Sequence, residues 1–310
     1  WIYHRNLGWL FAPESPQGEG VWLWSQEVGW LWTSESSFPY LYRDGTQSWF
    51  YFLARDDDVH LFYDFDASHW FTADELGVGT YTHIAETTQE VEGIIKDYGE
   101  RPIHFLHELG FSGPGTILVH CVLLDDSEIE RLAETRTTVV HCPSNHMKLA
   151  KGITRVPDLL KAGVNMTLGV DVMENLWVEM RNELQLQSIA NLNPQAVPRT
   201  APLHMATRNG ARALGMEGEL GVLKAGAKAD ITMVDIGGAS AHPFIDAMNH
   251  LLWRTEASDV RTVLVDGKIV LDDGKLQTLD EVETLDRVEK AAHAYIRRAG
   301  KEDLIPDYAR

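Results

Sequence analysis

This sequence has little cysteine, no long apolar run and no leader pattern. The chain of 310 residues has only two cysteines, Cys121 and Cys142. Two cysteines make no disulfide framework, so we expect a reducing, cytoplasmic compartment. No apolar run reaches the roughly 18 residues that a membrane-spanning helix requires. The first residues, WIYHRNLGWL, contain neither Met nor a signal-peptide pattern, and we interpret this start as a fragment or a processed end.

Basic residues are also scarce relative to acidic ones. Lys and Arg number 27 against 46 Asp and Glu, which gives a formal net charge of -19. Such a balance argues against a nucleic-acid partner, because phosphate binding needs clustered cations. A P-loop, a dinucleotide-binding glycine motif, a G-x-S-x-G elbow and the cytidine-deaminase signature are all missing. The sequence therefore excludes the commonest nucleotide-binding and serine-hydrolase patterns.

Aromatic residues are concentrated at the start of the chain. The first 75 residues hold 8 of the 10 Trp and 7 of the 10 Phe. They form short runs between turn residues, which is typical of β-hairpins: GWLF at 8–11, VWLW at 21–24, GWLW at 29–32 and WFYF at 49–52. We predict a Trp/Tyr-rich β module over 1–76, followed by a second region over 77–310. The segment resembles Trp/Tyr-rich modules near the ends of large bacterial surface proteins. Its rings could stack on sugars or simply form the core of a small sheet.

The second region alternates strand-like and helical patterns. Four apolar runs lie at 79–86, 116–121, 137–142 and 165–171, and each ends in a polar residue. Helical patterns separate the runs, and a further helix is predicted over 200–215. This βα repeat predicts a parallel sheet in an α/β fold, and polar strand ends are where a TIM-type barrel holds its chemistry. Two later runs, DVRTVLVDG and KIVLDDGKL, predict a β-hairpin in a small appended β-domain.

The residues at the strand ends suggest a metal site. They are His83, His120, His141 and Asp171. Imidazole with carboxylate suits a single Zn²⁺ or Fe²⁺, so we expect His83 and Asp171 to be metal ligands. Glu86, three residues after His83, could move protons between a metal-activated water and a ring nitrogen. His120 could orient that water or the substrate, and Asp171 could act in catalysis as well as in binding.

Other interpretations of these side chains stay open. A lone strand-end His is usually a hydrogen-bonded structural residue, and His141 is left as structural or substrate-lining. His104 and His107 imitate a helical metal pair but are expected to lie on a helix surface. Cys121 and Cys142 alternate with histidines in sequence, so we expect both to point away from the site as small buried hydrophobes. A third possibility is a Cys–His hydrolase that uses Cys121 or Cys142, but the sequence offers no orienting third residue for it.

Several motifs in order resemble the amidohydrolase superfamily, in particular its triazine hydrolases, chlorohydrolases and methylthioadenosine/S-adenosylhomocysteine and guanine deaminases. They are THIAETTQEVE, GPGTILVHCVLLDDSEIERLAET, TTVVHCPSNHMKLAKGI, LLKAGVNMTLGVD, MATRNGARALG and LGVLKAGAKADITMVD. The resemblance implies a (β/α)8 barrel with a mononuclear metal and fused β-sandwich strands. It implies hydrolysis of a C–N (or C–Cl) bond of a small nitrogen heterocycle, as in a deaminase. His83 is then a metal ligand, Glu86 the proton shuttle, His120 the residue that assists the water or substrate, and Asp171 a ligand of metal or water.

The sequence departs from the family pattern in three places. No H-x-H pair occurs in the chain, HCPSNH carries Asn145 and His146 where Ser and Asn are common, and GVDVMEN replaces G-T-D-G. The missing pair implies that the Trp-rich segment replaces the first four barrel strands. We therefore expect weak metal binding, poor turnover or none, and exposed sheet edges that favour homo-oligomers. The alternative function is a catalytically inactive truncated amidohydrolase fused to a carbohydrate- or surface-binding module.

Overall fold

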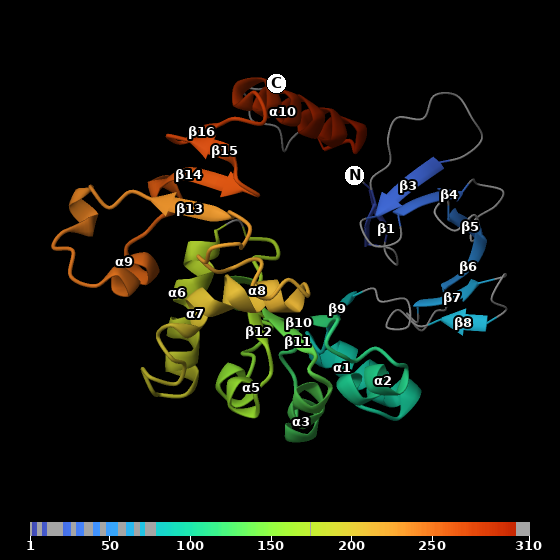
Figure 1. Cartoon of the computed structure of the whole chain (residues 1–310). Coiled ribbons are helices and arrows are strands. Elements are labelled where there is room, and N and C mark those ends of the chain that lie inside the picture. Colours follow the sequence, from blue (N-terminus) through green and yellow to red (C-terminus); the bar gives the residue numbers. More distant parts are fainter. Residues whose placement is uncertain are drawn as a thin grey trace. The chain divides into compact units, whose positions relative to one another are not determined.

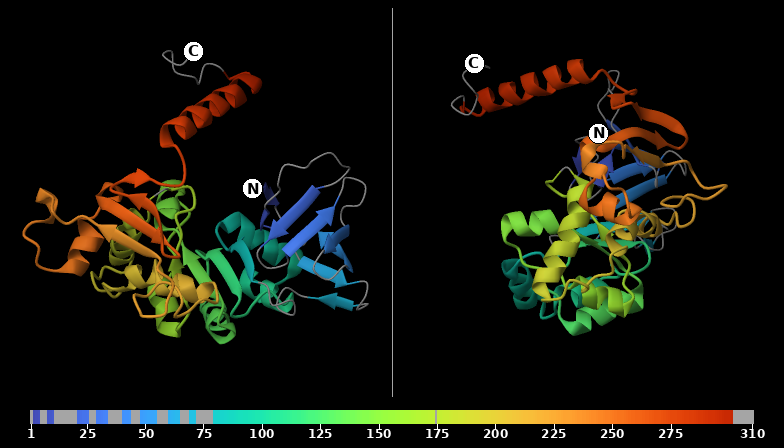
Figure 2. Two further views of the ribbon diagram at one scale, coloured as in Figure 1. Left: turned by 45° about the horizontal axis from the view of Figure 1, so that its top comes forward. Right: turned by 90° about the vertical axis from the view of Figure 1, so that its left-hand side faces the viewer.

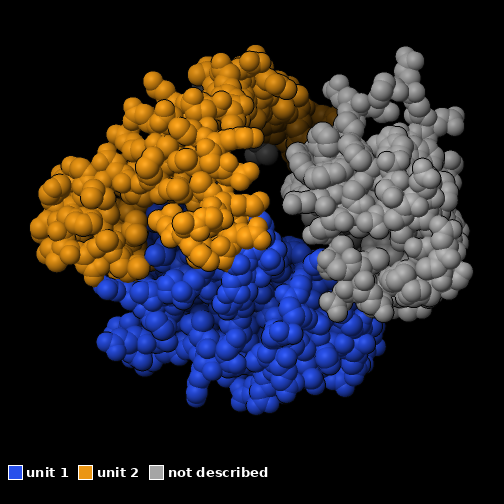
Figure 3. Space-filling view, viewed as in Figure 1, with its two compact units in different colours: residues 1–217 blue, residues 218–310 orange. Residues whose placement is uncertain are grey.

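The structure, a computed structural model, describes residues 79–173 and 175–301, together with the backbone of the strands before Gly79. The chain divides into two compact units, Trp1–Glu217 and Gly218–Arg310 (Figure 3). The boundary predicted near residues 76 and 77 falls within 72–78, outside the described residues, so it stays a prediction.

The described backbone of the aromatic segment is made of antiparallel strands. β1 (Ile2–His4) pairs with β2 (Gly8–Leu10). A second sheet follows chain order from β3 to β8. Its strands are β3 (Val21–Ser25), β4 (Gly29–Thr33), β5 (Tyr40–Arg43), β6 (Ser48–Ala54), β7 (His60–Asp64) and β8 (His69–Phe71). Both interpretations of the rings, stacking on sugars and forming the core of a small sheet, lie outside what the structure describes.

A parallel sheet of four strands carries the polar strand ends. Its strands are β9 (Thr80–Ile84), β10 (Thr116–His120), β11 (Thr138–His141) and β12 (Met166–Leu168). Neighbours in the sheet are neighbours in the chain, and every pair is parallel (Figure 1). Helices connect each strand to the next, as parallel pairing requires. The predicted α/β fold with a parallel sheet is thus confirmed.

The connecting helices begin and end where local chemistry predicts. They are α1 (Thr88–Tyr98), α2 (Pro102–Glu108), α3 (Asp126–Thr135), α4 (Pro143–Leu149), α5 (Val156–Ala162) and α6 (Leu176–Ala190). Asp125 is the N-cap of α3 and forms a capping box with Glu128, which satisfies two backbone N–H groups. Gly163 ends α5 in the left-handed conformation, with φ 87°.

The core of this unit lies between the parallel strands and their helices. Leu118, Val139 and Met166 come from three adjacent strands, and each is at most 1% exposed. Leu132 of α3 and Leu159 of α5 are completely buried as well. Burying each such side chain contributes roughly 1.5–3 kcal/mol. This packing fixes the strands, and with them the residues at their carboxyl ends.

The prediction of one continuous helix over 200–215 is wrong. The structure has two short helices there, α7 (Ala201–Met205) and α8 (Arg208–Ala213). Thr207 separates them with a non-helical backbone, φ -130° and ψ -99°, and its hydroxyl donates to the carbonyl of Leu203 at 2.6 Å. A Thr side chain that bonds back to the preceding turn commonly bends a helix.

The second unit contains an antiparallel sheet in the order β13-β14-β15-β16 (Figure 2). Its elements are β13 (Ile231–Val234), α9 (Ala247–Trp253), β14 (Val260–Val265), β15 (Lys268–Asp272), β16 (Lys275–Leu276) and α10 (Glu281–Arg298). The predicted hairpin is confirmed as β14–β15. Asp266 and Gly267 turn it with φ of 49° and 76°, the positive values that two-residue hairpin turns favour. Among the described residues, no helix is long and apolar enough to span a bilayer.

Candidate active site

The carboxyl ends of β9 and β10 hold an unusual backbone. Ala85 follows β9 with φ 53°, and His120 ends β10 with φ 76°. Left-handed backbone is uncommon for residues other than glycine, and it collects at functional sites. Hydrogen bonds hold the strained segment, because the amides of Val122 and Leu123 both donate to the Ala85 carbonyl at 3.0 Å. The Thr154 hydroxyl donates to the His120 carbonyl at 2.9 Å.

His120 is the residue on which the predicted site converges. Its side chain is 1% exposed, and Nε2 lies 3.7 Å from Oε1 of Glu86 and 3.9 Å from Oδ2 of Asp171. The ring of His83 lies edge-on to the ring of His120, with 4.8 Å between centroids. His83 itself is exposed. The structure thus brings the predicted site residues together, with His120 at the centre and Glu86, Asp171 and His83 around it.

Glu86 is held where it faces both this histidine and solvent. Its side chain is 22% exposed, and Oε1 lies 3.5 Å from Nζ of Lys151. The backbone amides of Ala85 and Glu86 each donate to the Glu90 carboxylate at 2.8 Å. Glu90 is the third residue of helix α1 and also completes its capping box. The start of α1 therefore fixes the turn that presents Glu86.

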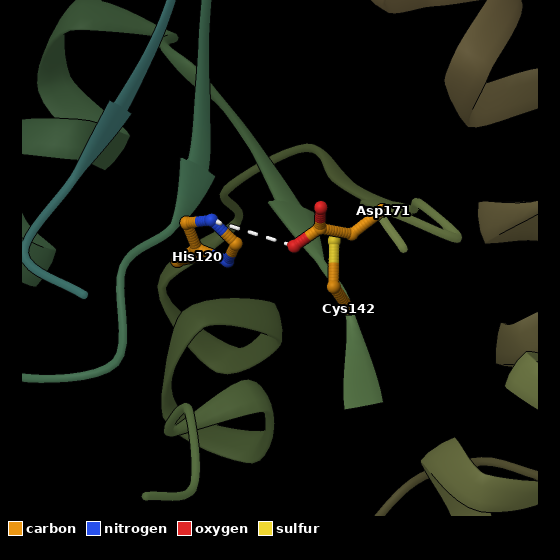
Figure 4. Close-up of side chains that lie close together, drawn as sticks. All are labelled: His120, Cys142 and Asp171. Atoms are coloured by element: carbon orange, nitrogen blue, oxygen red, sulfur yellow. Dashed lines mark ion pairs between the residues drawn. The ribbon is translucent and has the colours of Figure 1, made fainter. Parts of the chain in front are cut away.

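Asp171 follows β12 and has two close polar neighbours. The Asn145 amide donates a hydrogen bond to Oδ2 of Asp171. The Cys142 thiol also faces the Asp171 carboxylate (Figure 4). The expectation that Cys142 points away from the site is therefore wrong. β11 ends at His141, and Cys142 has left the strand with φ -122° and ψ 72°, so alternation along the strand no longer sets its direction. Burial, with the charge of Asp171, raises the pKa of this thiol to about 12.

A chain of buried side chains lies behind His120. Nδ1 of His120 is 3.0 Å from Nε2 of His146, on helix α4. The ring of His146 lies 5.0 Å from that of His141, centroid to centroid. Nδ1 of His141 is hydrogen-bonded to the fully buried Glu183 of α6. His141, which the sequence left as structural or substrate-lining, is thus a completely buried partner of Glu183.

His146 and Glu183 are residues that the sequence analysis missed as parts of the site. The signal for His146 was its place in HCPSNH, where Asn is common in the family, but the sequence does not show which way a helix turns its side chains. Burial, with the neighbouring His141 and His120, lowers the pKa of His146 to about 3. Burial also lowers the pKa of His120, with smaller opposing effects of Glu86 and Asp171. Both imidazoles are therefore neutral at neutral pH.

The donor atoms at this site suit a borderline metal ion. Among the described residues, one ligand atom each from His120, Cys142 and Asp171 lie within 4.8 Å of one another. Imidazole, thiolate and carboxylate are the ligand types of Zn²⁺. His83 is not part of that group, although its ring is beside His120. The chemistry of the donor set fits a zinc-like ion at the ends of β10 and β12.

The remaining candidates from the sequence, His104, His107 and Cys121, lie outside the site around His120. His104 and His107 are on α2, where they hydrogen-bond Ser127 and Ser112 at 2.9 Å and 2.7 Å. Cys121 is completely buried, and burial beside Glu128 raises the pKa of its thiol. None of these three is in the group around His120 among the described residues.

Comparison with known families gives a match over most of the chain. A model of the "Amidohydrolase family" matches residues 67–270. A 5'-deoxyadenosine deaminase of Methanosarcina mazei is 39% identical over 227 residues, which is 72% of this chain and 52% of that protein. The chain spans about half the length of the curated relatives that it matches.

Solved structures also match most of this chain. The crystal structure of an adenosine deaminase from Xanthomonas campestris with bound zinc is 30% identical, with a TM-score of 0.70 over 73% of this chain and 52% of that one. An atrazine chlorohydrolase from Arthrobacter aurescens complexed with zinc is 24% identical, with a TM-score of 0.65 over 72% of this chain and 50% of that one. The second likeness concerns the fold alone.

Proposed function

The chain belongs to the amidohydrolase family, and we propose that it carries the catalytic strand ends of a metal-dependent hydrolytic deaminase. The observation that carries this proposal is the approach of two carboxylates, Glu86 at 3.7 Å and Asp171 at 3.9 Å, to Nε2 of one buried histidine, His120. Deamination requires proton transfers to and from a water and a ring nitrogen, and acid–base groups gathered at one point suit it.

The proposed substrate is a small amino-substituted nitrogen heterocycle of the adenosine type. The 5'-deoxyadenosine deaminase and adenosine deaminase names of its relatives support a C–N bond as the bond that is cleaved. The chlorohydrolase likeness supports only the fold, so a C–Cl substrate is the weaker candidate. In the proposed reaction, water adds to the amino-bearing ring carbon, the C–N bond breaks, and ammonia leaves behind a ring carbonyl.

The side chains divide the work of that reaction. Glu86 takes a proton from the attacking water and delivers it to the ring nitrogen, and its partly exposed position lets it reach both. The neighbouring Lys151 at 3.5 Å stabilises the carboxylate form that Glu86 has before it takes the proton and regains after it delivers the proton. His120 directs Nε2 toward the water and stabilises charge that develops on its oxygen. Asp171, fixed by Asn145, accepts the second proton of the water and passes it to the amino group, which leaves as ammonia.

The family implies a metal, for which we propose His83 and Asp171 as ligands, with His120 and Cys142 beside them. A bound Zn²⁺ or Fe²⁺ supplies Lewis acidity, which lowers the pKa of water toward 7. Zinc in the related adenosine deaminase structure supports this choice of ion. His83 is exposed, so its ring can rotate to meet an ion beside His120.

The same proposal extends to the architecture. We propose that β9–β12 are four consecutive strands of a (β/α)8 barrel and that the second region begins near residue 77. Parallel strands in chain order with helices between them support the barrel. We also propose that the sheet β13–β16 corresponds to the β-sandwich strands that are fused to the barrel in the family.

The test is ammonia release by the purified full chain in excess Zn²⁺, with adenosine, 5'-deoxyadenosine and methylthioadenosine as substrates and chloride release from a chlorotriazine as a second arm. We expect ammonia from at least one nucleoside, and a fall of about 10²–10⁴-fold in Glu86→Gln. Glu92→Gln, an exposed position on α1, is the matched control and should retain activity. Turnover that persists in Glu86→Gln, or none in the wild type, would overturn the proposal.

A further inference from the structure

The two ring nitrogens of His120 have neighbours of opposite kind. Nε2 faces the carboxylates of Glu86 and Asp171, at 3.7 Å and 3.9 Å. Nδ1 faces another imidazole, with Nε2 of His146 at 3.0 Å. The His120 ring is 1% exposed, so solvent does not screen the different electrostatic surroundings of its two nitrogens. Its two tautomers are therefore unequal in energy.

The surroundings select one of these tautomers. A proton on Nε2 is favoured because that nitrogen points into the negative potential of two carboxylates. Nδ1 is then a bare acceptor, so the hydrogen of the 3.0 Å contact must come from Nε2 of His146. Nδ1 of His146 is left without a proton, and it has no hydrogen-bond partner among the described residues. A buried nitrogen that lacks a donor is easier to tolerate than a buried N–H that lacks an acceptor.

The position of His146 is fixed from its other side. It lies on α4 against the ring of His141, at 5.0 Å, and is itself 1% exposed. His141 is in turn held by Glu183 on α6, and both are completely buried. Helix α4 is also anchored to α6, because the backbone amide of Ser144 donates to Glu179 at 3.0 Å. The ring of His146 therefore has little freedom to turn away from His120.

We propose that His146 is a positioning residue, which donates from Nε2 to Nδ1 of His120 and so holds the Nε2–H of His120 toward Glu86 and Asp171. This role rests on the proposed function only for its catalytic consequence. The hydrogen bond fixes the ring plane and the tautomer together, so that His120 presents an N–H donor where a reacting oxygen would lie. With Nε2 protonated, His120 lies beside the ion and is not one of its ligands, which agrees with His83 and Asp171 as the proposed ligands. In the neutral ring, the other tautomer would present a bare nitrogen to two carboxylates.

The experiment is nitrogen NMR on the full chain labelled with ¹⁵N-histidine, because the shifts of the two ring nitrogens report the tautomer directly. The signals of His120 are assigned by their loss in His120→Gln. Three variants are compared: His146→Gln, which keeps a donor, His146→Leu, which removes it, and His104→Gln as a matched control on α2. We expect Nε2–H in the wild type, in His146→Gln and in the control, and a mixture of tautomers in His146→Leu.

An Nδ1–H tautomer of His120 in the wild type would overturn the proposal, and this measurement decides even where His146→Leu does not fold. An unchanged tautomer in a folded His146→Leu would overturn it equally. In the deaminase assay, kcat of His146→Leu should fall about tenfold or more with little change in KM, and His146→Gln should recover part of it. Absence of activity in the wild type defeats the proposed function but leaves the NMR result intact.

Discussion

The Asn145 amide donates a hydrogen bond to Oδ2 of Asp171, the same oxygen that lies 3.9 Å from Nε2 of His120. Asn145 comes from helix α4, which also carries His146, the partner of the other His120 nitrogen. One short helix thus orients both a carboxylate and an imidazole of the candidate site.

Asn145→Ala should weaken zinc binding by about 10–100-fold, the usual effect of removing a hydrogen bond that orients a metal ligand. Without the amide, the Asp171 side chain can rotate away from His120. Isothermal titration with Zn²⁺ measures the change. Asn249→Ala, at an exposed position of α9, should leave the affinity as it is. Equal affinities for the two variants would contradict the role given to Asn145.

Zinc binding by the wild-type chain should be weak at neutral pH and should strengthen as the pH rises. The donor group contains a thiol whose pKa is raised to about 12 by burial and Asp171, so a proton competes with the metal for Cys142. Titrations at several pH values check this, with Cys121→Ser as the control for the other thiol. A tight site at one equivalent whose affinity does not change with pH would contradict it.

Glu183→Ala should destabilise the fold by about 3 kcal/mol, because it leaves the buried Nδ1 of His141 without its partner. Urea denaturation of the full chain measures the loss. The control is Glu134→Ala, whose side chain is 66% exposed and pairs with Arg131 at 3.0 Å. That exposed pair is expected to contribute no more than about 1 kcal/mol. Similar losses in both variants would argue against a buried His141–Glu183 pair.

Gly169→Ala should cost about 1–3 kcal/mol by overpacking. A Cβ at this position would lie 2.8 Å from Cγ1 of Val140 and 3.0 Å from Sγ of Cys142. Gly210→Ala is the matched control, since nothing lies within 4 Å of its Cβ and the residue is inside helix α8. That change should stabilise by up to about 1 kcal/mol through helix propensity. Opposite signs in thermal unfolding are the expected outcome, and a neutral Gly169→Ala would contradict it.

Asp125→Ala should lower stability by about 1 kcal/mol near neutral pH, the usual effect of losing an N-cap. Burial raises the pKa of Asp125, but hydrogen bonds from Ser127 and Glu128 and the charge of Arg101 outweigh it, so the net pKa is lowered. A lowered pKa means that the stabilisation is present above the unfolded value, about 3.9, and is lost as pH falls through the folded value.

Asp125→Asn keeps the cap without the charge and separates the two contributions. Its stability near neutral pH should lie between the wild type and Asp125→Ala. Acid denaturation curves of the three proteins should show that the advantage of the wild type over Asp125→Asn disappears in acid. A constant difference at all pH values would show that the carboxyl of Asp125 does not titrate as the structure indicates.

The parallel sheet could be predicted from sequence because its signals are local. Apolar runs ended by His83, His120 and Asp171 place the strands, and Asp125 and Gly163 mark helix ends. The gathering of polar strand ends also follows, because carboxyl ends of parallel strands meet at one edge.

Side-chain directions beyond the strand ends could not be predicted in the same way. Cys142 turns toward Asp171 because the chain leaves β11 at His141, and His146 meets His120 through the rotation of α4. Both depend on backbone angles that alternation along a strand does not specify. The break at Thr207 was missed for a related reason, since a hydroxyl that bonds to Leu203 competes locally with a continuous helix.

The order of β9–β12 has a consequence for how the chain folds during synthesis. From β10 onward, each strand pairs with the one made just before it, so its partner is already present when it leaves the ribosome. Only one connecting helix or helix pair separates partners, which keeps the loop-closure entropy of each pairing small. The sheet can therefore grow one strand at a time, and the turn that presents Glu86 can form before β12 and Asp171 have been translated.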